Sequence, residues 1–507
     1  SPKKLTPVAV KPARASQKVD KKVDKKTDFA AAFCANIPEG IRKQFHADLL
    51  DIIVARHESL SAARKAGDTY IEVFNPNEAT HGWTSAHTVV NVISDDKAFI
   101  IDSVIALLTS KSYLIELIAH PLVFLTRDKA GKITAVTAAR DSALEGESHI
   151  FVQLNRRLTE SEMADLKTDL AHVYEDVHLT NRDWLDIRTQ VMAVSEQIKA
   201  ASYADPAMKA DHIDFINYIH DDNFTLLGYC EYDVSAKKAN LAPKKSSGLG
   251  LFSAERSSNF ISTSDQDHVL NAEIVASLGP ITMTKLGKMS PVHRCVPLDA
   301  ILVKKTDASG KLLGLHVILG LFTSVTYSRG LTTVPFLRFK ADAVLAKAGF
   351  EGKEHSGRAL RHILERFPRD ELFQIDVKNL YTICMSIMQL QEQPRIAVYF
   401  SPDAFGRQIT AITYVPKDLY DTRLRIKFAC VLEEELNASY VDFQSAVDNS
   451  PLVRLTFTLA WNDDAKRKFD IAQIEERLQR GIDVGFVQHP NARDARGDKG
   501  RLSKSAE

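Results

Sequence analysis

The sequence has few cysteines and no long apolar run. Its 507 residues include five cysteines, which are widely scattered and never form a CxxC pair, so we expect neither a disulfide framework nor a zinc site. No stretch of about 18 apolar residues occurs, and the N-terminal lysines are not followed by an apolar segment, which argues against a membrane span and a secretion signal. These absences predict a protein of the reducing cytoplasm.

Neither sign of charge is in excess, because 65 basic residues balance 65 acidic ones. The balance conceals a basic leader, since residues 1–27 hold nine Lys or Arg against two Asp. Such a leader suits nucleic acid or a membrane surface, but its Lys, Pro and Ala composition favours a solvated, disordered tail. Residues 482–507 lack periodicity and are also predicted to be disordered. We therefore expect neither a nucleic acid nor a membrane as partner.

The motifs of common enzyme classes are missing. No P-loop, HExxH, GxSxG or kinase set is present, and the nearest approach to a dinucleotide-binding turn, Gly248–Ser253, lacks the third glycine. His355 and His362 share a predicted helix with Glu365, but the interleaved Leu and Ile place these polar groups on its solvent side rather than around a metal. We expect no catalytic, cofactor-binding or metal-binding residue in this chain.

Periodicity divides the chain into about three domains. Residues 28–70 are predicted to form a helical cap. Residues 71–200 give a strand at 89–94, a helix, strands at 114–128 and 147–157, and a helix that opens with the capping box Thr159-x-x-Glu162, followed by a further helix. This βαββα order is typical of a ferredoxin-like unit.

The rest of the chain repeats this pattern after a less regular region. Residues 211–337 are β-rich and irregular, residues 338–393 are helical with boundaries at Gly349, Ser356 and Asp376, and residues 394–481 give βαββα again once their first two strands are taken as a hairpin. The predicted fold class is therefore α/β of the α+β kind, with tandem ferredoxin-like units, antiparallel sheets and helical connections.

Several long motifs carry a family resemblance. These are DDNFTLLGYCEYDV, LGLFTSVTY, VPFLR, HSGRALRHILERFPRDELFQI, FGRQITAITYVPKDLYDTRLR and VLEEEL. They resemble the N-terminal third of the large NAD-specific glutamate dehydrogenases of bacteria, where a series of three ACT-like domains joined by helical segments precedes the catalytic domain. The resemblance implies that residues 71–200, 211–337 and 394–481 are ACT-like domains 1, 2 and 3.

The resemblance also implies a function. The parent enzyme deaminates glutamate to 2-oxoglutarate and ammonia with NAD, which would bind in a catalytic domain outside this chain, so the chain alone is expected to be inactive. Its expected role is regulation and assembly of a homo-oligomer, a tetramer in the parent enzyme, with an amino acid as a possible effector. The alternative is a purely structural scaffold that binds no effector.

ACT domains hold their ligands at the turn between the first strand and the first helix, which is Ser94–Phe99 here. Asp95 and Asp96 are candidates for an effector amino group and Lys97 for its carboxylate, but the turn has no Gly or Pro, which favours plain helix capping by the carboxylates. His293 and Arg294 form a second basic candidate, for which a surface salt bridge is the favoured alternative.

Overall fold

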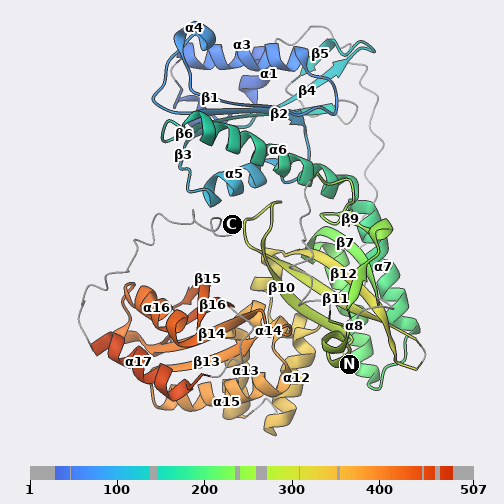
Figure 1. Ribbon diagram of the computed structural model, residues 1–507, viewed down its shortest axis with the longest axis vertical. Helices are drawn as coiled ribbons and strands as arrows, with labels where there is room; N and C mark the ends of the chain where they lie inside the picture. The colour runs from blue at the N-terminus through green and yellow to red at the C-terminus, as the bar shows by residue number, and fades with distance from the viewer. Residues whose placement is uncertain are drawn as a thin grey trace, which may run out of the picture.

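The structure is a computed structural model that describes residues 29–483, except 46, 138–144, 235–239, 258–270, 308, 351–353, 448–449 and 463–468. The described residues form three antiparallel sheets that follow one another along the chain (Figure 1). We call them the sheets of the N-terminal, middle and C-terminal units. The predicted leader lies outside the described residues, as does the predicted tail beyond Asp483.

The N-terminal unit surrounds a six-stranded sheet with the order β1-β2-β6-β4-β5, in which β3 also pairs with β6. Its elements are α1 (Phe29–Ala35), α2 (Glu39–Arg42), α3 (Ala47–Ala63), β1 (Tyr70–Phe74), α4 (Glu78–His81), β2 (Val89–Asp95), α5 (Ile100–Ser110), β3 (Ile115–Ala119), β4 (Leu122–Arg127), β5 (Ile133–Thr137), β6 (Glu145–Leu154) and α6 (Glu160–Arg182).

The strand predicted at 114–128 is divided. β3 pairs with β6 through Ile118 and Val152, and β4 pairs with it through Leu122 and Ser148, so both keep one register along the same strand. The division falls at Pro121, which has no N–H to donate to the ladder. The prediction of one continuous strand at 114–128 is therefore wrong. Strands β1 and β5 were not predicted.

Both faces of this sheet are covered by helices. Val90, Val92 and Ile150 pack with α5 and α6 on one face, whereas Val89 and Phe151 pack with α1 and α3 on the other. This alternation follows from the two-residue period of a strand. The helices predicted at 28–70 exist, but they form a second layer on the sheet rather than a separate cap.

The middle unit is an antiparallel sheet with the order β10-β11-β12-β7-β8, and β9 adds to β7. Its elements are α7 (Trp184–Ala200), α8 (Pro206–Tyr218), a π-helical turn (Ile219–Asn223), β7 (Phe224–Val234), β8 (Leu241–Pro243), η2 (Lys245–Ser247), β9 (Leu249–Gly250), α10 (Ala272–Ser277), β10 (Ile281–Met289), β11 (Pro297–Thr306) and β12 (Leu312–Phe322). Helices α7 and α8 cover one face. The β-rich character is as predicted, but β10, β11 and β12 form a meander, so the strand order is not βαββα.

A helical segment connects the middle unit to the C-terminal unit. It contains α11 (Ser324–Ser328), η3 (Leu331–Thr333), α12 (Leu337–Ala348), α13 (His355–Arg366), α14 (Arg369–Gln374) and α15 (Val377–Glu392). Gly349 ends α12 in a left-handed conformation, and the Asp376 carboxylate caps α15, as predicted. Helix α13 begins one residue before the predicted Ser356, and its N-cap residue makes no side-chain cap.

The C-terminal unit contains β13 (Ala397–Pro402), β14 (Gln408–Pro416), η4 (Lys417–Leu419), α16 (Leu424–Leu436), β15 (Ala438–Ala446), β16 (Leu452–Trp461) and α17 (Ile471–Asp483). Helices α16 and α17 pack on one face of the sheet, and the helical segment packs on the other through Ala397, Ile412 and Tyr414. The strand order is β13-β14-β16-β15.

The N-terminal and C-terminal units share one topology. In each, a strand and a helix are followed by further strands and a second helix, and the last strand of this series pairs with the first. The C-terminal series is β14, α16, β15, β16 and α17, whereas the N-terminal series is β2, α5, β3 with β4, then β5, β6 and α6. An additional strand that precedes the series, β1 or β13, pairs with the outer side of the first strand. The βαββα prediction therefore holds for the C-terminal unit, and it holds for the N-terminal unit except for the additional strand β5 and the division of the second strand into β3 and β4.

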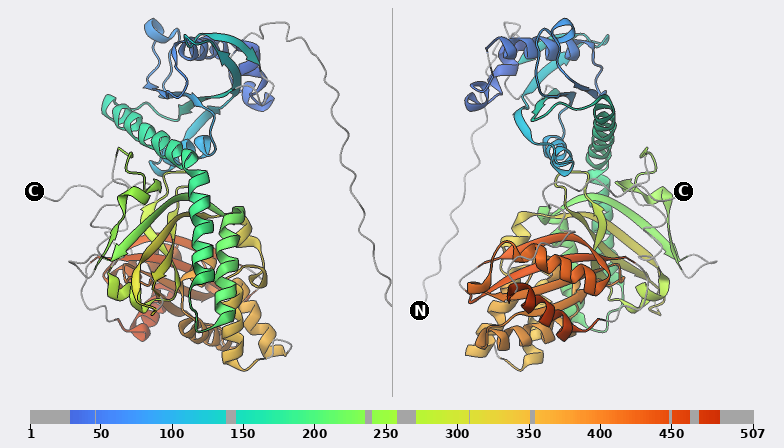
Figure 2. Two further views of the ribbon diagram at one scale, coloured as in Figure 1. Left: turned by 90° about the vertical axis from the view of Figure 1, so that its right-hand side faces the viewer. Right: turned by 60° about the vertical axis from the view of Figure 1, so that its left-hand side comes forward.

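Helices α6 and α7 connect the N-terminal and middle units with only Asp183 between them (Figure 2). The Asp183 carboxylate accepts a hydrogen bond of 2.8 Å from the Gly250 amide, which attaches the middle sheet to this junction. Leu227, Val292 and Leu321 of the middle unit join the hydrophobic core of α5 and α6. The units are thus packed against each other rather than joined only by the chain.

Candidate functional site

The turn between β2 and α5 lies at the base of the N-terminal unit. Asp95 ends β2, and its carboxylate accepts hydrogen bonds from Arg64 Nη2 at 2.8 Å and from the Gly67 amide at 3.0 Å. These bonds fasten the loop that follows α3 to the end of β2. Asp95 therefore does not cap α5, contrary to the helix-capping prediction.

Asp96 is exposed and does not cap the helix either. Its amide donates to the Gly146 carbonyl oxygen at 2.8 Å, which continues the pairing of β2 with β6. The residue that precedes α5 is Phe99, with a φ of 72° and no side-chain cap. A left-handed Phe costs on the order of 1 kcal/mol, so the turn adopts the conformation that Gly would favour although the sequence supplies none.

Lys97 meets His178 across the turn. The Lys97 ammonium contacts His178 Nδ1, so the base of α6 closes over the start of α5. Burial lowers the pKa of Lys97, and the Asp95 carboxylate opposes this effect. Burial also lowers the pKa of His178, and the charges of Lys97 and Arg182 act in the same direction. The pair therefore favours a neutral imidazole beside an ammonium group.

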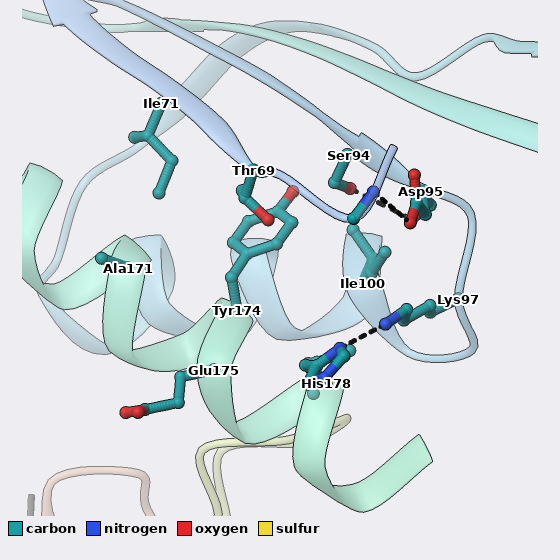
Figure 3. Close-up of a pocket in the computed structure, with 12 residues that line it drawn as sticks. Thr69, Ile71, Ser94, Asp95, Lys97, Ile100, Ala171, Tyr174, Glu175 and His178 are labelled. Carbon is teal, nitrogen blue, oxygen red and sulfur yellow. Dashed lines mark hydrogen bonds between the residues drawn. The ribbon is translucent and has the colours of Figure 1, made fainter. Parts of the chain in front are cut away.

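A cavity of about 270 Å³ lies beside this pair (Figure 3). We call it the turn pocket. It is lined by Gly67, Thr69, Ile71, Ser94, Asp95, Lys97, Ile100, Ala171, Tyr174, Glu175, Val177 and His178. Two of the predicted effector residues, Asp95 and Lys97, thus line one cavity, whereas Asp96 does not.

The buried Tyr174 hydroxyl has no hydrogen-bond partner among the described residues. The side chain is buried, and burial raises the pKa of its phenol. The nearby Ser94 hydroxyl acts to lower the pKa of Tyr174. The Ser94 hydroxyl itself donates a hydrogen bond to the Asp95 carbonyl oxygen at 3.2 Å. Sequence reasoning missed Tyr174 and His178, because both belong to α6, which meets the turn only in the folded chain.

His293 touches the N-terminal unit from the middle unit. Its amide donates to Ser103 Oγ at 2.9 Å, its Nδ1 lies 3.0 Å from Asp102 Oδ2, and its ring centroid is 4.9 Å from that of Phe99. The predicted salt bridge is therefore available to His293 when its imidazole is protonated. Its partner lies on α5, so His293 fastens two units together near the turn.

Arg294 does not join His293 at the turn. Its Nη2 donates to the Phe322 carbonyl oxygen at 2.7 Å, and its Nε is buried without a hydrogen-bond partner. It forms no ion pair with a described residue, so the predicted surface salt bridge is absent. Arg294 lines a second cavity, of about 430 Å³, between the middle sheet, α14 and the C-terminal sheet. We call it the junction cavity.

The junction cavity contains acidic and basic side chains that the sequence did not single out. Lys285 donates to Asp299 at 2.8 Å and lies 3.5 Å from Asp370. Burial works to lower the Lys285 pKa, but the charges of Asp299 and Asp370 outweigh it and raise that pKa. The sequence signal that could have identified these side chains is a charged residue within an otherwise apolar strand, such as Asp299 in β11.

Metal binding finds no support in the described part of the chain, where no group of three or more His, Cys, Asp or Glu side chains is placed to hold an ion. His355 and His362 are exposed on α13, as predicted, and the Glu365 carboxylate accepts from the Leu331 amide at 3.0 Å. No helix of the described ranges is long and apolar enough to cross a membrane.

Comparison with protein families matches three parts of the chain. The model described as glutamate dehydrogenase, ACT1 domain, matches residues 29–170, helical motif 1 of glutamate dehydrogenase matches residues 334–393, and its ACT2 domain matches residues 397–483. The first match includes the helices predicted as a separate cap. The unit predicted as the third ACT-like domain is the one that matches ACT2.

Individual relatives agree with these matches. The NAD-specific glutamate dehydrogenase of Halomonas elongata is 31% identical over 419 residues, which are 80% of this chain and 26% of that protein. That of Pseudomonas aeruginosa is 28% identical over 80% of this chain, and that of Mycobacterium tuberculosis is 22% identical over 81%. The chain spans about a quarter of the length of these relatives.

Proposed function

We propose that this chain, which belongs to the glutamate dehydrogenase family and carries its ACT1 domain, helical motif 1 and ACT2 domain, is the N-terminal regulatory and oligomerising region of an NAD-dependent enzyme. The parent enzyme would convert L-glutamate, NAD and water to 2-oxoglutarate, ammonia and NADH. NAD would bind in a catalytic domain outside these 507 residues. The observation that carries the proposal is the order of the three family matches along the chain.

The turn pocket supports a regulatory role. It lies between the β2–α5 turn and α6, and Lys97 and Tyr174 line the same cavity, the Tyr174 hydroxyl being buried without a hydrogen-bond partner among the described residues. An ammonium group and a hydroxyl suit the carboxylate of an amino acid, since ionised acceptors form the stronger hydrogen bonds. The Asp95 carboxylate already accepts hydrogen bonds from Arg64 and the Gly67 amide, so it lines the pocket but is not free to accept a hydrogen bond from a ligand.

Binding there would regulate the enzyme only if the ligand prefers one conformation. A ligand shifts an equilibrium by its difference in affinity for the two states. An occupant of the turn pocket contacts β2, α5 and α6 together, and α6 leads directly into α7 of the middle unit. A small change in the position of α6 would therefore be passed to the middle sheet.

The test is a calorimetric titration of the 507-residue chain with a panel of L-amino acids. We expect saturable binding of one or a few of them, weakened at least about tenfold in Lys97→Gln because the carboxylate loses its charged partner. Lys288→Gln, a substitution outside the pocket, is the matched control. A flat response across the panel would remove the sensing role. Assays with glutamate and NAD should give no NADH from this chain alone.

A scaffold without an effector is the alternative. The edge strand β15 favours it, because among the described residues β15 pairs only with β16 and exposes Tyr440. An open edge is a template for pairing with a second chain. Light scattering should then give a ligand-independent oligomer, and a strict monomer at high concentration would contradict the assembly role.

A further inference from the structure

The junction cavity differs from the turn pocket in its position and its charges. It lies where β10, β11 and β12 of the middle sheet meet α14 and the face of the C-terminal sheet that is opposite α16 and α17. Its volume of about 430 Å³ is in the range of small-molecule sites. An occupant would touch the middle and C-terminal units at once.

Most of the charges around this cavity are paired. Lys285 lies between Asp299 and Asp370, and the Tyr327 hydroxyl also donates to Asp370 at 2.8 Å. Arg407, from the β13–β14 hairpin, pairs with Asp403 at 3.2 Å and donates to the Lys285 carbonyl oxygen at 3.0 Å. These groups hold the hairpin against the middle sheet, and their charges are already compensated.

Three charged side chains of the lining, Arg294, Glu371 and the partly buried Asp442, have no ionic partner among the described residues, and Arg294 and Glu371 are of opposite sign. The Arg294 guanidinium has a carbonyl oxygen as its partner, and its Nε is buried and unbonded. The Glu371 carboxylate is 7% exposed and accepts hydrogen bonds from Thr410 Oγ1 at 2.8 Å and from Ser401, but no basic group of the described residues lies within ion-pair distance. Both side chains line the same cavity.

The energetics of these two groups indicate what they require. An unpaired buried charge is costly, and a guanidinium is best satisfied by a carboxylate, which it binds with two parallel hydrogen bonds. Burial raises the pKa of Glu371 to about 7, so the group is only partly ionised near neutral pH, and an arriving ammonium group would favour its carboxylate form by supplying the missing counter-ion. A carboxylate and an ammonium on one small molecule satisfy both.

The remaining charges limit which zwitterion fits. The lining carboxylates are Asp299, Asp370, Glu371, Asp403 and Asp442, and the lining bases are Lys285 and Arg294. Arg407 compensates Asp403 from just outside, so the acids still exceed the bases. A ligand with an additional carboxylate would be repelled, whereas an additional ammonium or a neutral side chain would be accepted.

We propose that the junction cavity binds a neutral or basic L-α-amino acid, with its carboxylate on Arg294 and its ammonium on Glu371. This site is separate from the turn pocket, and only the consequence of binding rests on the proposed regulatory function. The occupant would bridge the middle sheet and the C-terminal unit and would favour the conformation in which they are packed together.

The experiment is a set of calorimetric titrations on the 507-residue chain with L-glutamine, L-lysine and L-glutamate. We expect glutamine and lysine to bind, and glutamate, which has the size of glutamine and one more negative charge, to bind at least about tenfold more weakly. Nα-acetyl-L-glutamine lacks the ammonium and L-glutamine methyl ester lacks the carboxylate. Each should lose at least about tenfold in affinity.

Variants then locate the site. Arg294→Gln and Glu371→Gln should each weaken glutamine binding at least about tenfold, whereas Lys97→Gln in the turn pocket should leave it unchanged. Circular dichroism and thermal unfolding of each variant establish that it is folded, and Glu371→Gln keeps the size of the side chain.

The outcomes separate this proposal from the previous one. Glutamine affinity unchanged in Arg294→Gln and Glu371→Gln, binding of either derivative as tight as that of glutamine, or no binding by the parent chain overturns the junction site. Binding that only Lys97→Gln weakens would retain effector sensing and remove this site. Binding that only Arg294→Gln and Glu371→Gln weaken would retain this site and remove the turn pocket.

Discussion

The buried imidazoles of His57 and His149 should make the N-terminal unit sensitive to acid. His57 lies on α3 and His149 on β6, their Nδ1 atoms are 3.2 Å apart, and both side chains are 0% exposed. The rings of Phe29 and Phe33 pack against this pair. Since one Nδ1 must accept the hydrogen bond, at least one imidazole is neutral, and adding a second proton would place like charges together without water.

The magnitude follows from the pKa of His57. Burial, with the charge of His149, lowers that pKa from 6.5 to about 3. The folded state therefore binds the proton less readily than the unfolded state, so this stabilisation is complete above pH 6.5 and is lost as the pH falls towards 3. Linkage gives a loss of about 2 kcal/mol at pH 5 relative to pH 8.

Other buried groups also lower the stability of the N-terminal unit in acid, but over a different pH range. Burial works to raise the pKa of Glu147, but hydrogen bonds from His149 and Ser61 and the charge of Arg64 outweigh it and lower the pKa from 4.5 to about 2. Its contribution is present above pH 4.5 and is lost as the pH falls towards 2, so it changes by only a few tenths of a kcal/mol at pH 5. Burial lowers the pKa of His149 as well, which adds to the effect of His57.

The perturbation is His57→Phe, which fills the aromatic site and removes the titrating group. Trp83 packs against the same core, so a parent carrying Trp184→Phe and Trp461→Phe reports on this unit by its fluorescence during urea unfolding. We expect the parent to lose about 2 kcal/mol or more between pH 8 and pH 5, and His57→Phe to lose about 2 kcal/mol less. At pH 8 the variant should be less stable by about 1–3 kcal/mol, because His149 loses its partner.

The control is His362→Phe, because His362 is exposed on α13. It should leave the pH dependence of the N-terminal unit at the parent value. If His57→Phe shows the same difference between pH 8 and pH 5 as the parent, the buried pair does not set the acid response and the reasoning is refuted.

Two further substitutions test the energetics of the N-terminal unit, and one tests the middle sheet. Thr159→Ala removes the capping box of α6 and should cost about 1 kcal/mol, measured by urea unfolding and by faster amide exchange in the first turn; an unchanged first turn would contradict it. Glu147→Gln removes the buried carboxylate that pairs with the guanidinium groups of Arg64 and Arg127. It should lower the free energy of unfolding by about 3–5 kcal/mol in the Trp83 fluorescence assay, and a loss below about 1 kcal/mol would contradict this expectation. In Gly320→Ala, the added Cβ would overlap the Thr225 carbonyl oxygen and should destabilise the middle sheet by about 3 kcal/mol, whereas Ala at Gly279, where there is room, is the control.

The sequence by itself determined features whose cause lies within a few residues. The Thr159 and Glu162 capping box and the Asp376 cap join groups two or three residues apart, so they are readable in the sequence. The strand and helix periods gave the βαββα order of two units, and the long motifs gave the family. These features depend only on local conformation, so they can be predicted without the tertiary structure.

Only the tertiary structure decided where the polar groups of the sites point. Asp95 does not cap its own helix because Arg64, 31 residues earlier, binds its carboxylate, and Lys97 meets His178 only because α6 returns across the turn 81 residues later. Arg294 separates from its neighbour His293 into the junction cavity, where it shares a space with Glu371. Such encounters depend on how sheets and helices pack over long sequence distances, and no local period encodes them.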